Sequence, residues 1–123
     1  MKTILLVEDV PLNRDLMVQL LEDKFHILQA EDGFQAIAIA LQSNPDMIMM
    51  DLSLPGLDGW KTIKTLKTNP STKHIPIIAL TAHAMSGDKE RVMGLGCVDY
   101  ISKPVDERLL FKALQSILQE DAT

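Results

Sequence analysis

Residues 47–51 read Met-Ile-Met-Met-Asp, an uninterrupted apolar run that ends directly in a carboxylate. Three other apolar runs also lead into charged or hydroxyl residues, namely Glu8 and Asp9, Thr81, and Lys103. If the runs are parallel strands of one sheet, these side chains gather outside the carboxyl ends of the strands, where open α/β sheets bind ligands. Three carboxylates, a hydroxyl and an ammonium group in one pocket predict a site for a divalent cation and a phosphoryl group.

The bulk composition allows one modest domain. A chain of 123 residues with 46% hydrophobic and 24% charged residues is ordinary globular composition and supports a single core. Its net charge of -5 argues against direct nucleic-acid binding, which usually requires a basic surface. The apolar runs are too short for membrane insertion, no signal-peptide pattern precedes the first run, and the single Cys97 suits a reducing compartment. We therefore expect a cytoplasmic protein.

Strand-like and helical segments alternate along the chain. Apolar runs start near Ile4, Phe25, Met47, Ile77 and Val98, and helical periodicity lies between them. Runs of Ile, Leu, Val and Met without alternation are typical of a parallel sheet that is covered on both faces. Alternating β and α elements with right-handed crossovers predict an α/β fold, a three-layer sandwich.

Apolar stripes and capping residues predict the helices in more detail. The expected buried stripes are Leu12, Leu16, Leu20 and Leu21, then Ala36, Ile37, Ala40 and Leu41, and finally Leu110, Ala113, Leu114, Ile117 and Leu118. The expected boundary signals are Pro11 in a first helical turn, N-caps at Asp58 and Asp106, and helix ends at Asn44-Pro45 and Asn69-Pro70.

The chemistry of the predicted edge follows from its charges. Asp51 ends a wholly apolar strand, so its carboxylate is held by rigid backbone and partly shielded from water. Two carboxylates about 4 Å apart repel by about 4 kcal/mol at an effective dielectric of 20, unless a cation lies between them. Magnesium suits such a site because it binds one or two carboxylates and shares its other positions with water and phosphate. With Lys103 and Thr81 also stabilising phosphoryl oxygens, an aspartate can act as a nucleophile and form an aspartyl phosphate.

At these positions the chain resembles the receiver domain of two-component response regulators, and the resemblance covers essentially all of it. The family pattern is matched by Glu8 and Asp9 after strand one, Asp51 after strand three, Thr81 after strand four, and Lys103-Pro104 after strand five. The runs at 54–59 and 96–104 resemble the loop after the phosphoacceptor and the final strand. The resemblance implies a flavodoxin-like (βα)5 fold with sheet order 2-1-3-4-5. It also implies one receiver domain over 1–123 with no output domain, as in the stand-alone chemotaxis and cell-cycle receivers.

The resemblance further implies a phosphorylation site at Asp51. A histidine kinase or a histidine phosphotransfer protein would be the phosphodonor. The expected cofactor is Mg²⁺, with Mn²⁺ as an alternative, held by Asp9, Asp51 and the backbone carbonyl of Ser53, and by Glu8 through water. Lys103 and Thr81 would contact the phosphoryl group. No turnover of other substrates is implied, so the chain is not expected to be an enzyme beyond losing its own phosphoryl group.

Thr81 and Tyr100 are the switch residues that the resemblance implies. Thr81 would move toward the phosphoryl group, and Tyr100 would rotate inward into the space that Thr81 leaves. The face formed by the fourth helix, fifth strand and fifth helix would then signal to a downstream protein target. The resemblance also implies a cis peptide at Lys103-Pro104, and donor docking on the first helix around Asn13, Arg14 and Met17.

Several readings stay open from the sequence alone. A haloacid-dehalogenase-like phosphatase would need an acid at Ser53, and a flavodoxin-like carrier would need a phosphate loop where residues 8–11 are acidic. A phosphorylation-independent interaction module with this fold is the remaining alternative. Tyr100 can also be ordinary core, and His83, two positions after Thr81, is a hypothetical shield of the aspartyl phosphate against water. We expect Cys97 to be a small buried residue. We expect a solvated basic face from Lys61, Lys64, Lys67 and Lys73.

Overall fold

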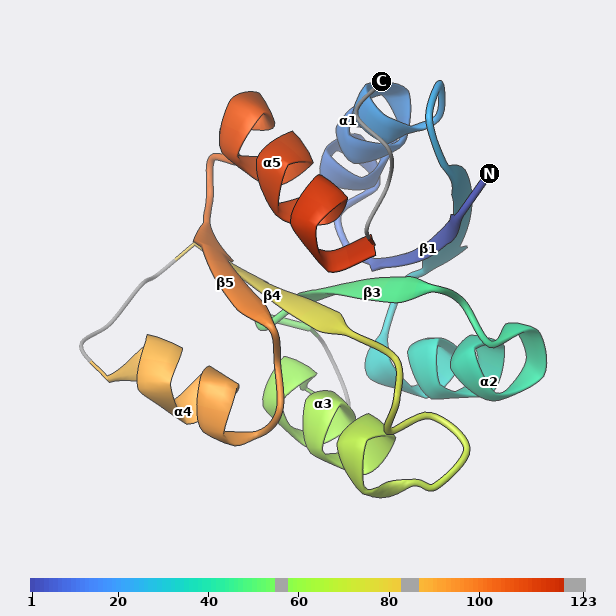
Figure 1. Ribbon diagram of the computed structural model, residues 1–123, viewed down its shortest axis with the longest axis vertical. Helices are drawn as coiled ribbons and strands as arrows, with labels where there is room; N and C mark the ends of the chain where they lie inside the picture. Colours follow the sequence, from blue (N-terminus) through green and yellow to red (C-terminus); the bar gives the residue numbers. More distant parts are fainter. Residues whose placement is uncertain (55–57, 83–86, 119–123) are drawn as a thin grey trace.

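The computed structural model describes residues 1–54, 58–82 and 87–118. Strands and helices alternate through these residues, as the sequence predicts (Figure 1). The elements are β1 (Thr3–Val7), α1 (Pro11–Leu21), β2 (His26–Ala30), α2 (Gly33–Ser43), β3 (Met47–Asp51), α3 (Gly59–Thr68), β4 (Ile77–Thr81), α4 (Asp88–Gly94), β5 (Asp99–Ser102) and α5 (Glu107–Leu118). Among the described helices, none has the length and apolar character that crossing a membrane requires.

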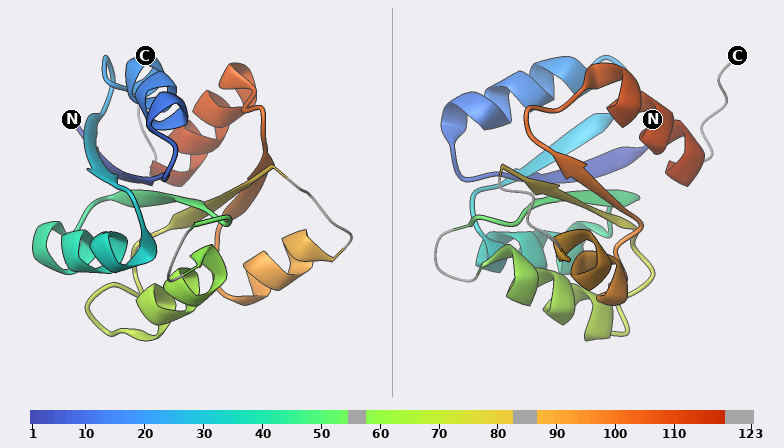
Figure 2. Two further views of the ribbon diagram at one scale, coloured as in Figure 1. Left: turned by 180° about the vertical axis from the view of Figure 1, so that it is seen from behind. Right: turned by 90° about the vertical axis from the view of Figure 1, so that its left-hand side faces the viewer.

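The five strands form one parallel sheet in the order β2-β1-β3-β4-β5. This order and the three-layer flavodoxin-like arrangement are confirmed. Helices α1 and α5 cover one face of the sheet, and α2, α3 and α4 cover the other (Figures 1 and 2). In the register of the sheet, Val7 lies beside Met50, so the residues that follow β1 and those that end β3 meet at the same edge.

The core lies in two layers, one on each face of the sheet. One layer contains Leu5, Ile48 and Met50 with side chains of α2, α3 and α4, and the other contains Ile4 and Met49 with side chains of α1 and α5. The two faces of β1, β3 and β4 are buried, but the edge strands β2 and β5 keep partly exposed residues. The prediction of a sheet covered on both faces therefore holds for its three central strands.

The predicted helix boundaries are largely confirmed. Pro11 begins α1, and the Asp58 carboxylate accepts a hydrogen bond from the N–H of Lys61 at 2.8 Å. The Asp106 carboxylate accepts the N–H of Arg108 at 2.9 Å before α5. Asn44 ends α2 in the left-handed region with a φ of 46°, a conformation that asparagine tolerates better than most residues.

The predicted buried stripe of α1 is wrong in its phase. Leu12 is 68% exposed and Leu16 is 55% exposed, although both were expected in the core. The helix instead packs Met17, Val18 and Leu21 against the sheet, with Leu20 at the margin. Leu21 is fully buried and lies three and four residues after the partly buried Val18 and Met17, so the three share one helix face that is rotated away from Leu12 and Leu16.

The other two stripes hold better. Ala36 and Ala40 of α2 are buried, but Leu41 faces solvent, and so does Phe34 one turn before Ile37. The small Ala36 and Ala40 side chains occupy the core, while the larger Ile37 and Ile39 are partly buried against it. The stripe of α5 is confirmed, with Leu110, Leu114 and Leu118 in the core.

Lys67 departs from the predicted solvated basic face. Its Nζ donates to the carbonyl oxygens of Lys73 at 3.1 Å and Ile75 at 2.6 Å, and its methylenes pack against Gly96. Burial lowers the pKa of Lys67. Cys97 is buried, as predicted, and burial raises the pKa of its thiol to about 11. Lys67 therefore closes the turn between α3 and β4, whereas Lys61, Lys64 and Lys73 are exposed as expected.

Candidate functional site

Three carboxylates meet where β1 and β3 end. One ligand oxygen from each of Glu8, Asp9 and Asp51 lies within 4.8 Å of the others. Glu8 is 2% exposed and Asp51 is 3% exposed, while Asp9 is half-buried at the opening. The parallel pairing of β1 with β3 brings them together, because residues that end neighbouring parallel strands share one edge.

Lys103 places a cation against two of these carboxylates. Its Nζ lies 2.8 Å from Glu8 Oε1 and 3.1 Å from Asp51 Oδ2. The main-chain N–H of Lys103 also donates to the carbonyl oxygen of Thr81 at 2.7 Å, which extends the β4–β5 pairing beyond the strand end. The Lys103–Pro104 peptide bond is cis. Residues 8, 51 and 103, far apart in the sequence, thus form one hydrogen-bonded cluster.

The surroundings of the two buried carboxylates shift their pKa values in opposite directions. Burial and the neighbouring Asp51 raise the pKa of Glu8, and Lys103 only partly offsets this. Burial acts to raise the pKa of Asp51 too, but hydrogen bonds from Glu8 and from the Ser53 N–H, with the charge of Lys103, lower it overall. The same two carboxylates raise the pKa of Lys103 despite its partial burial. At neutral pH Asp51 is therefore an ionised, buried carboxylate next to a cation.

Tight packing at the start of α3 fixes the backbone of Asp51. The Ser53 N–H donates to Asp51 Oδ1 at 3.0 Å, which orients the carboxylate. Gly59 lies so close to this strand end that a β-carbon added to it would sit 2.4 Å from the Asp51 carbonyl oxygen. Sequence reasoning included Gly59 only within a family-like loop and did not identify this role. The one feature of the sequence that pointed to Gly59 is its position directly after Asp58, the predicted N-cap of the helix.

Tyr100 of β5 pairs with Ala79 of β4, two residues before Thr81, so the side chains of Thr81 and Tyr100 lie on the same face of the sheet. Thr81 is buried at the end of its strand, and the Tyr100 hydroxyl is enclosed by protein atoms. Burial raises the pKa of Tyr100, and the Asp88 carboxylate of α4 raises it further, whereas the Thr81 hydroxyl acts in the opposite direction. The hydroxyls of Thr81 and Tyr100 and the first turn of α4 are therefore electrostatically linked. His83 lies outside the described residues.

Arg14 belongs to the site in a way that the sequence did not indicate. Its Nη1 donates to the main-chain carbonyl of Glu8 at 2.9 Å, and its Nη2 lies 3.6 Å from Glu31 Oε1. The Arg14 side chain is only 13% exposed. It was expected on the docking surface of the first helix, but its guanidinium is turned toward the acidic loop. Asn13 and Met17, expected on the same surface, line a neighbouring pocket.

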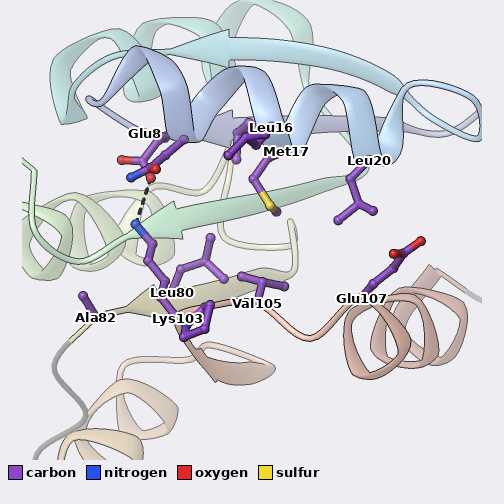
Figure 3. Close-up of a pocket in the computed structure, with 12 residues that line it drawn as sticks. Glu8, Leu16, Met17, Leu20, Leu80, Ala82, Lys103, Val105 and Glu107 are labelled. Carbon is purple, nitrogen blue, oxygen red and sulfur yellow. Dashed lines mark hydrogen bonds and ion pairs between the residues drawn. The ribbon is translucent and has the colours of Figure 1, made fainter.

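That pocket, of about 650 Å³, opens beside the cluster (Figure 3). Met17 and Leu20 of α1 point into it, opposite Leu80 and Val105, and Glu8 and Lys103 form its polar end. Its remaining lining residues are Leu6, Asn13, Leu16, Ala82, Pro104 and Glu107. An apolar recess therefore leads directly to the carboxylate cluster.

The donor set of the cluster fits Mg²⁺. Mg²⁺ prefers hard oxygen ligands, commonly one or two carboxylates together with water and phosphate oxygens. Asp9 and Asp51 provide such carboxylates at the ends of β1 and β3, and the buried Glu8 carboxylate lies within 4.8 Å of both. Asp9 is partly exposed, so its carboxylate stays in contact with water.

Comparison with known proteins agrees with this geometry. Residues 4–115 match the family model of the response regulator receiver domain, so the chain belongs to the response regulator receiver family. Proteins of this family are signalling modules that take phosphoryl groups from histidine kinases or phosphotransfer proteins and act on downstream targets.

Similar proteins include single-domain and kinase-linked receivers. The polar-differentiation response regulator DivK of Brucella ovis is 38% identical over 118 residues, which cover 95% of this chain and 96% of that protein. The receiver domain of sensor histidine kinase PA1611 from Pseudomonas aeruginosa PAO1 superposes with a TM-score of 0.88 at 35% identity, covering 97% of this chain and 98% of the other. That structure has a magnesium ion coordinated in the active site cleft. The chemotaxis protein CheY4 of Vibrio cholerae gives a TM-score of 0.88 at 27% identity, over 95% of this chain and 98% of that one.

Proposed function

We propose that this chain is a cytoplasmic response regulator receiver whose Asp51 accepts a phosphoryl group from a phosphohistidine. A histidine kinase or a histidine phosphotransfer protein would be the donor. The observation that carries the proposal is the setting of Asp51. Its carboxylate is buried, its pKa is lowered, its Oδ2 lies 3.1 Å from Lys103 Nζ, and two further carboxylates stand beside it. Such a group is ionised, oriented and close to positive charge, which is what a carboxylate nucleophile requires.

We assign the cation site to Asp9, Asp51 and the backbone carbonyl of Ser53, with Glu8 acting through water. This assignment is supported by the clustering of the three carboxylates and by the position of Ser53, two residues after the end of β3, where its N–H donates to Asp51 Oδ1. Mg²⁺ is the expected cation, and Mn²⁺ is chemically compatible with the same oxygen donors. When bound, the cation supplies positive charge to the phosphoryl oxygens.

In the transfer step, an Asp51 carboxylate oxygen forms a bond to phosphorus while the bond between phosphorus and the donor's imidazole nitrogen breaks. The electron pair of that bond stays on the imidazole nitrogen, and because the donor's other ring nitrogen carries a proton, the donor histidine leaves as a neutral imidazole. Lys103 Nζ, which now pairs with Glu8 and Asp51, would donate to a phosphoryl oxygen, and the Thr81 hydroxyl would donate to another. Hydrolysis of the resulting acyl phosphate would return the chain to its starting state.

We propose that Thr81 and Tyr100 convert this event into a change of surface. Thr81 would turn toward the phosphoryl group, and Tyr100 would occupy the space beside it. The Tyr100 hydroxyl is already enclosed by protein atoms, which supports an inward orientation that the side chain can adopt before phosphorylation. Phosphorylation would then act by increasing the population of chains with Tyr100 in this orientation. The output face would comprise α4, β5 and α5, where a second pocket of about 560 Å³ is lined by Tyr100 and Leu109.

The phosphodonor would dock on a different face, over the pocket between α1 and the segment that leads into α5. This placement is supported by the continuity of the pocket with Glu8 and Lys103 (Figure 3). The exposed Leu12 and Leu16 on α1 also support it. Input and output would therefore use separate surfaces, which allows a donor and a downstream protein target to be recognised by different side chains.

The test is covalent labelling by a small phosphodonor. The purified chain is incubated with MgCl2 and acetyl phosphate or phosphoramidate, and intact-protein mass spectrometry follows a base-labile adduct of one phosphoryl group. We expect labelling of the wild type and of Asp23→Asn, which changes an exposed aspartate, and none of Asp51→Asn. A wild type that stays unlabelled by both donors at saturating Mg²⁺ would contradict the proposal and favour the phosphorylation-independent interaction module.

A further inference from the structure

We propose that Arg14 is a positioning residue for the cation site, because its guanidinium fixes the peptide unit that joins Glu8 to Asp9. This inference rests on the proposed function, since it assigns a role to Arg14 in the same site. It gives a purpose to a nearly buried arginine that touches none of the reacting groups.

The contact falls on the peptide that decides where Asp9 points. The Glu8 carbonyl belongs to the Glu8–Asp9 peptide, and it accepts Arg14 Nη1 at 2.9 Å. On the other side, the Glu8 N–H donates to the carbonyl of Ala30 at 3.0 Å. Both main-chain polar groups of Glu8 are therefore occupied, and the peptide that precedes Asp9 cannot rotate without losing a charge-assisted hydrogen bond.

Arg14 is itself anchored from two directions. Its main-chain N–H donates to the Val10 carbonyl at 3.0 Å in the first turn of α1, and its Nη2 lies 3.6 Å from the carboxylate of Glu31. Glu31 follows directly after β2, so Arg14 ties the loop between β1 and α1 to the loop between β2 and α2. The acidic pair is thereby held from the neighbouring strand as well as from its own.

Positioning and simple electrostatics predict opposite results. A guanidinium beside a cation site repels Mg²⁺, so removing its charge alone would strengthen Mg²⁺ binding. Removing a contact that orients a ligand-bearing peptide should weaken Mg²⁺ binding, because groups behind metal ligands typically contribute about 10- to 100-fold to affinity. The sign of the change in Kd therefore separates the two roles.

The experiment is isothermal titration calorimetry of the whole chain with MgCl2 in the absence of any phosphodonor. We expect Arg14→Ala to raise the Kd for Mg²⁺ by about 10-fold or more. Arg14→Lys keeps the charge and one donor, so its Kd should lie between those of Arg14→Ala and the wild type. Glu31→Gln loosens the anchor and should raise the Kd by a smaller factor. Arg108→Ala, which removes the same charge from an exposed position on α5, should leave the Kd unchanged.

Labelling by acetyl phosphate gives the second measurement. If Arg14 positions the acidic pair, the Mg²⁺ concentration for half-maximal labelling should rise in step with Kd, and the rate at saturating Mg²⁺ should recover to that of the wild type. A Kd for Arg14→Ala equal to or tighter than that of the wild type would overturn the inference. So would a depressed maximal rate with an unchanged Mg²⁺ dependence.

Two further results keep the test decisive. If Arg14→Ala does not fold, as judged by circular dichroism, Arg14→Lys and Glu31→Gln carry the comparison, and an unchanged Kd in both overturns the inference. If the wild type binds Mg²⁺ but takes no phosphoryl group, the proposed function fails while the Arg14 role is still measured by the Kd. If the wild type is labelled normally but the Kd for Mg²⁺ is unaltered in Arg14→Ala, the proposed function stands and the inference about Arg14 fails.

Discussion

Gly59 and Asp51 touch through their main chains. The approach of the α3 start to the end of β3 leaves no room for a side chain, since an added β-carbon would lie 2.4 Å from the Asp51 carbonyl oxygen and 2.6 Å from the Leu52 Cα. Both of these atoms are backbone, so neither can move aside as a flexible side chain could. The position of Asp51 therefore depends on the absence of one methyl group.

Gly59→Ala should lower the free energy of unfolding by about 1–3 kcal/mol, the usual cost of overpacking, and should slow the labelling of Asp51. Chemical denaturation and acetyl phosphate labelling measure the two effects. Gly94→Ala is the matched control, because nothing lies within 4 Å of its added β-carbon. In helical Gly94 the same change should be neutral or stabilising by about 0.5–1 kcal/mol. Equal behaviour of the two variants would refute the steric argument.

Glu8→Gln should stabilise the metal-free chain increasingly as pH rises. Burial and the Asp51 carboxylate raise the pKa of Glu8, so the folded state holds its proton more tightly than the unfolded state. The stability that this proton provides is complete below the ordinary pKa of glutamate and is lost as pH rises through the raised value. Glutamine does not titrate, so the variant keeps its stability across that range.

Denaturation in EDTA at pH 4 and at pH 7 measures this effect. The difference in unfolding free energy, variant minus wild type, should be more positive at pH 7. Asp51→Asn provides the opposite case, because the lowered pKa of Asp51 gives stability that is present above the ordinary aspartate pKa and lost as pH falls. If the difference in unfolding free energy between Glu8→Gln and the wild type does not vary with pH, the pKa of Glu8 is not raised in the folded chain and the prediction is wrong.

Lys67→Met should destabilise the fold by about 1–3 kcal/mol, because the carbonyl oxygens of Lys73 and Ile75 would lose a charged donor in a partly buried turn. Methionine keeps most of the apolar length that packs against Gly96. Lys64→Met, on the exposed face of the same helix, should change stability by less than about 0.5 kcal/mol. Urea denaturation of both variants decides the point, and similar losses would show that Lys67 has no special role.

Cys97 should react slowly with thiol reagents in the folded chain. Its pKa of about 11 leaves only about one thiol in a thousand ionised at pH 8, and the side chain is 5% exposed. Iodoacetamide is added to the folded chain and to the chain in urea for the same reaction time, and the products are measured by mass spectrometry. Alkylation of Cys97 should be complete only in the urea sample. Rapid alkylation without denaturant would mean that the thiol is accessible.

Arg91→Ala should shift the fluorescence of Trp60, the only tryptophan of the sequence. The Arg91 guanidinium lies 4.0 Å from the centre of the Trp60 ring and joins α4 to α3. Removing it exposes the ring to water, so the emission maximum should move to longer wavelength, and stability should fall by about 0.5–2 kcal/mol. Lys89→Ala on the exposed side of α4 should leave the spectrum unchanged. An unshifted emission in Arg91→Ala would contradict the stacking.

The fold class was predictable because its three central strands, β1, β3 and β4, are apolar along most of their length. Caps such as Asp58 marked the helix starts, whereas the sheet order followed only from the family resemblance. The phase of α1 was not predictable in the same way. Leucines at positions 12, 16, 20 and 21 offer two faces, and the choice between them depends on how the helix rests on the sheet.

The site was predictable only as a set of strand ends. Glu8, Asp51 and Lys103 could be grouped because parallel strands end at one edge. The roles of Arg14 and Gly59 depend on main-chain atoms of other residues, and such contacts leave no residue-type pattern in a sequence. A buried arginine that binds a carbonyl and an exposed arginine that binds a partner look the same until the helix is placed.

The pairing of Lys103 with Glu8 spans 95 residues. Any fragment that stops before the last strand holds the buried carboxylates of Glu8 and Asp51 without the cation that balances them. The first and last strands must therefore both be in place before the acidic cluster can remain charged inside the protein. Under the proposed function, completion of the sheet and formation of the reactive Asp51 carboxylate are thus one event, so a partly folded chain would be unable to accept a phosphoryl group.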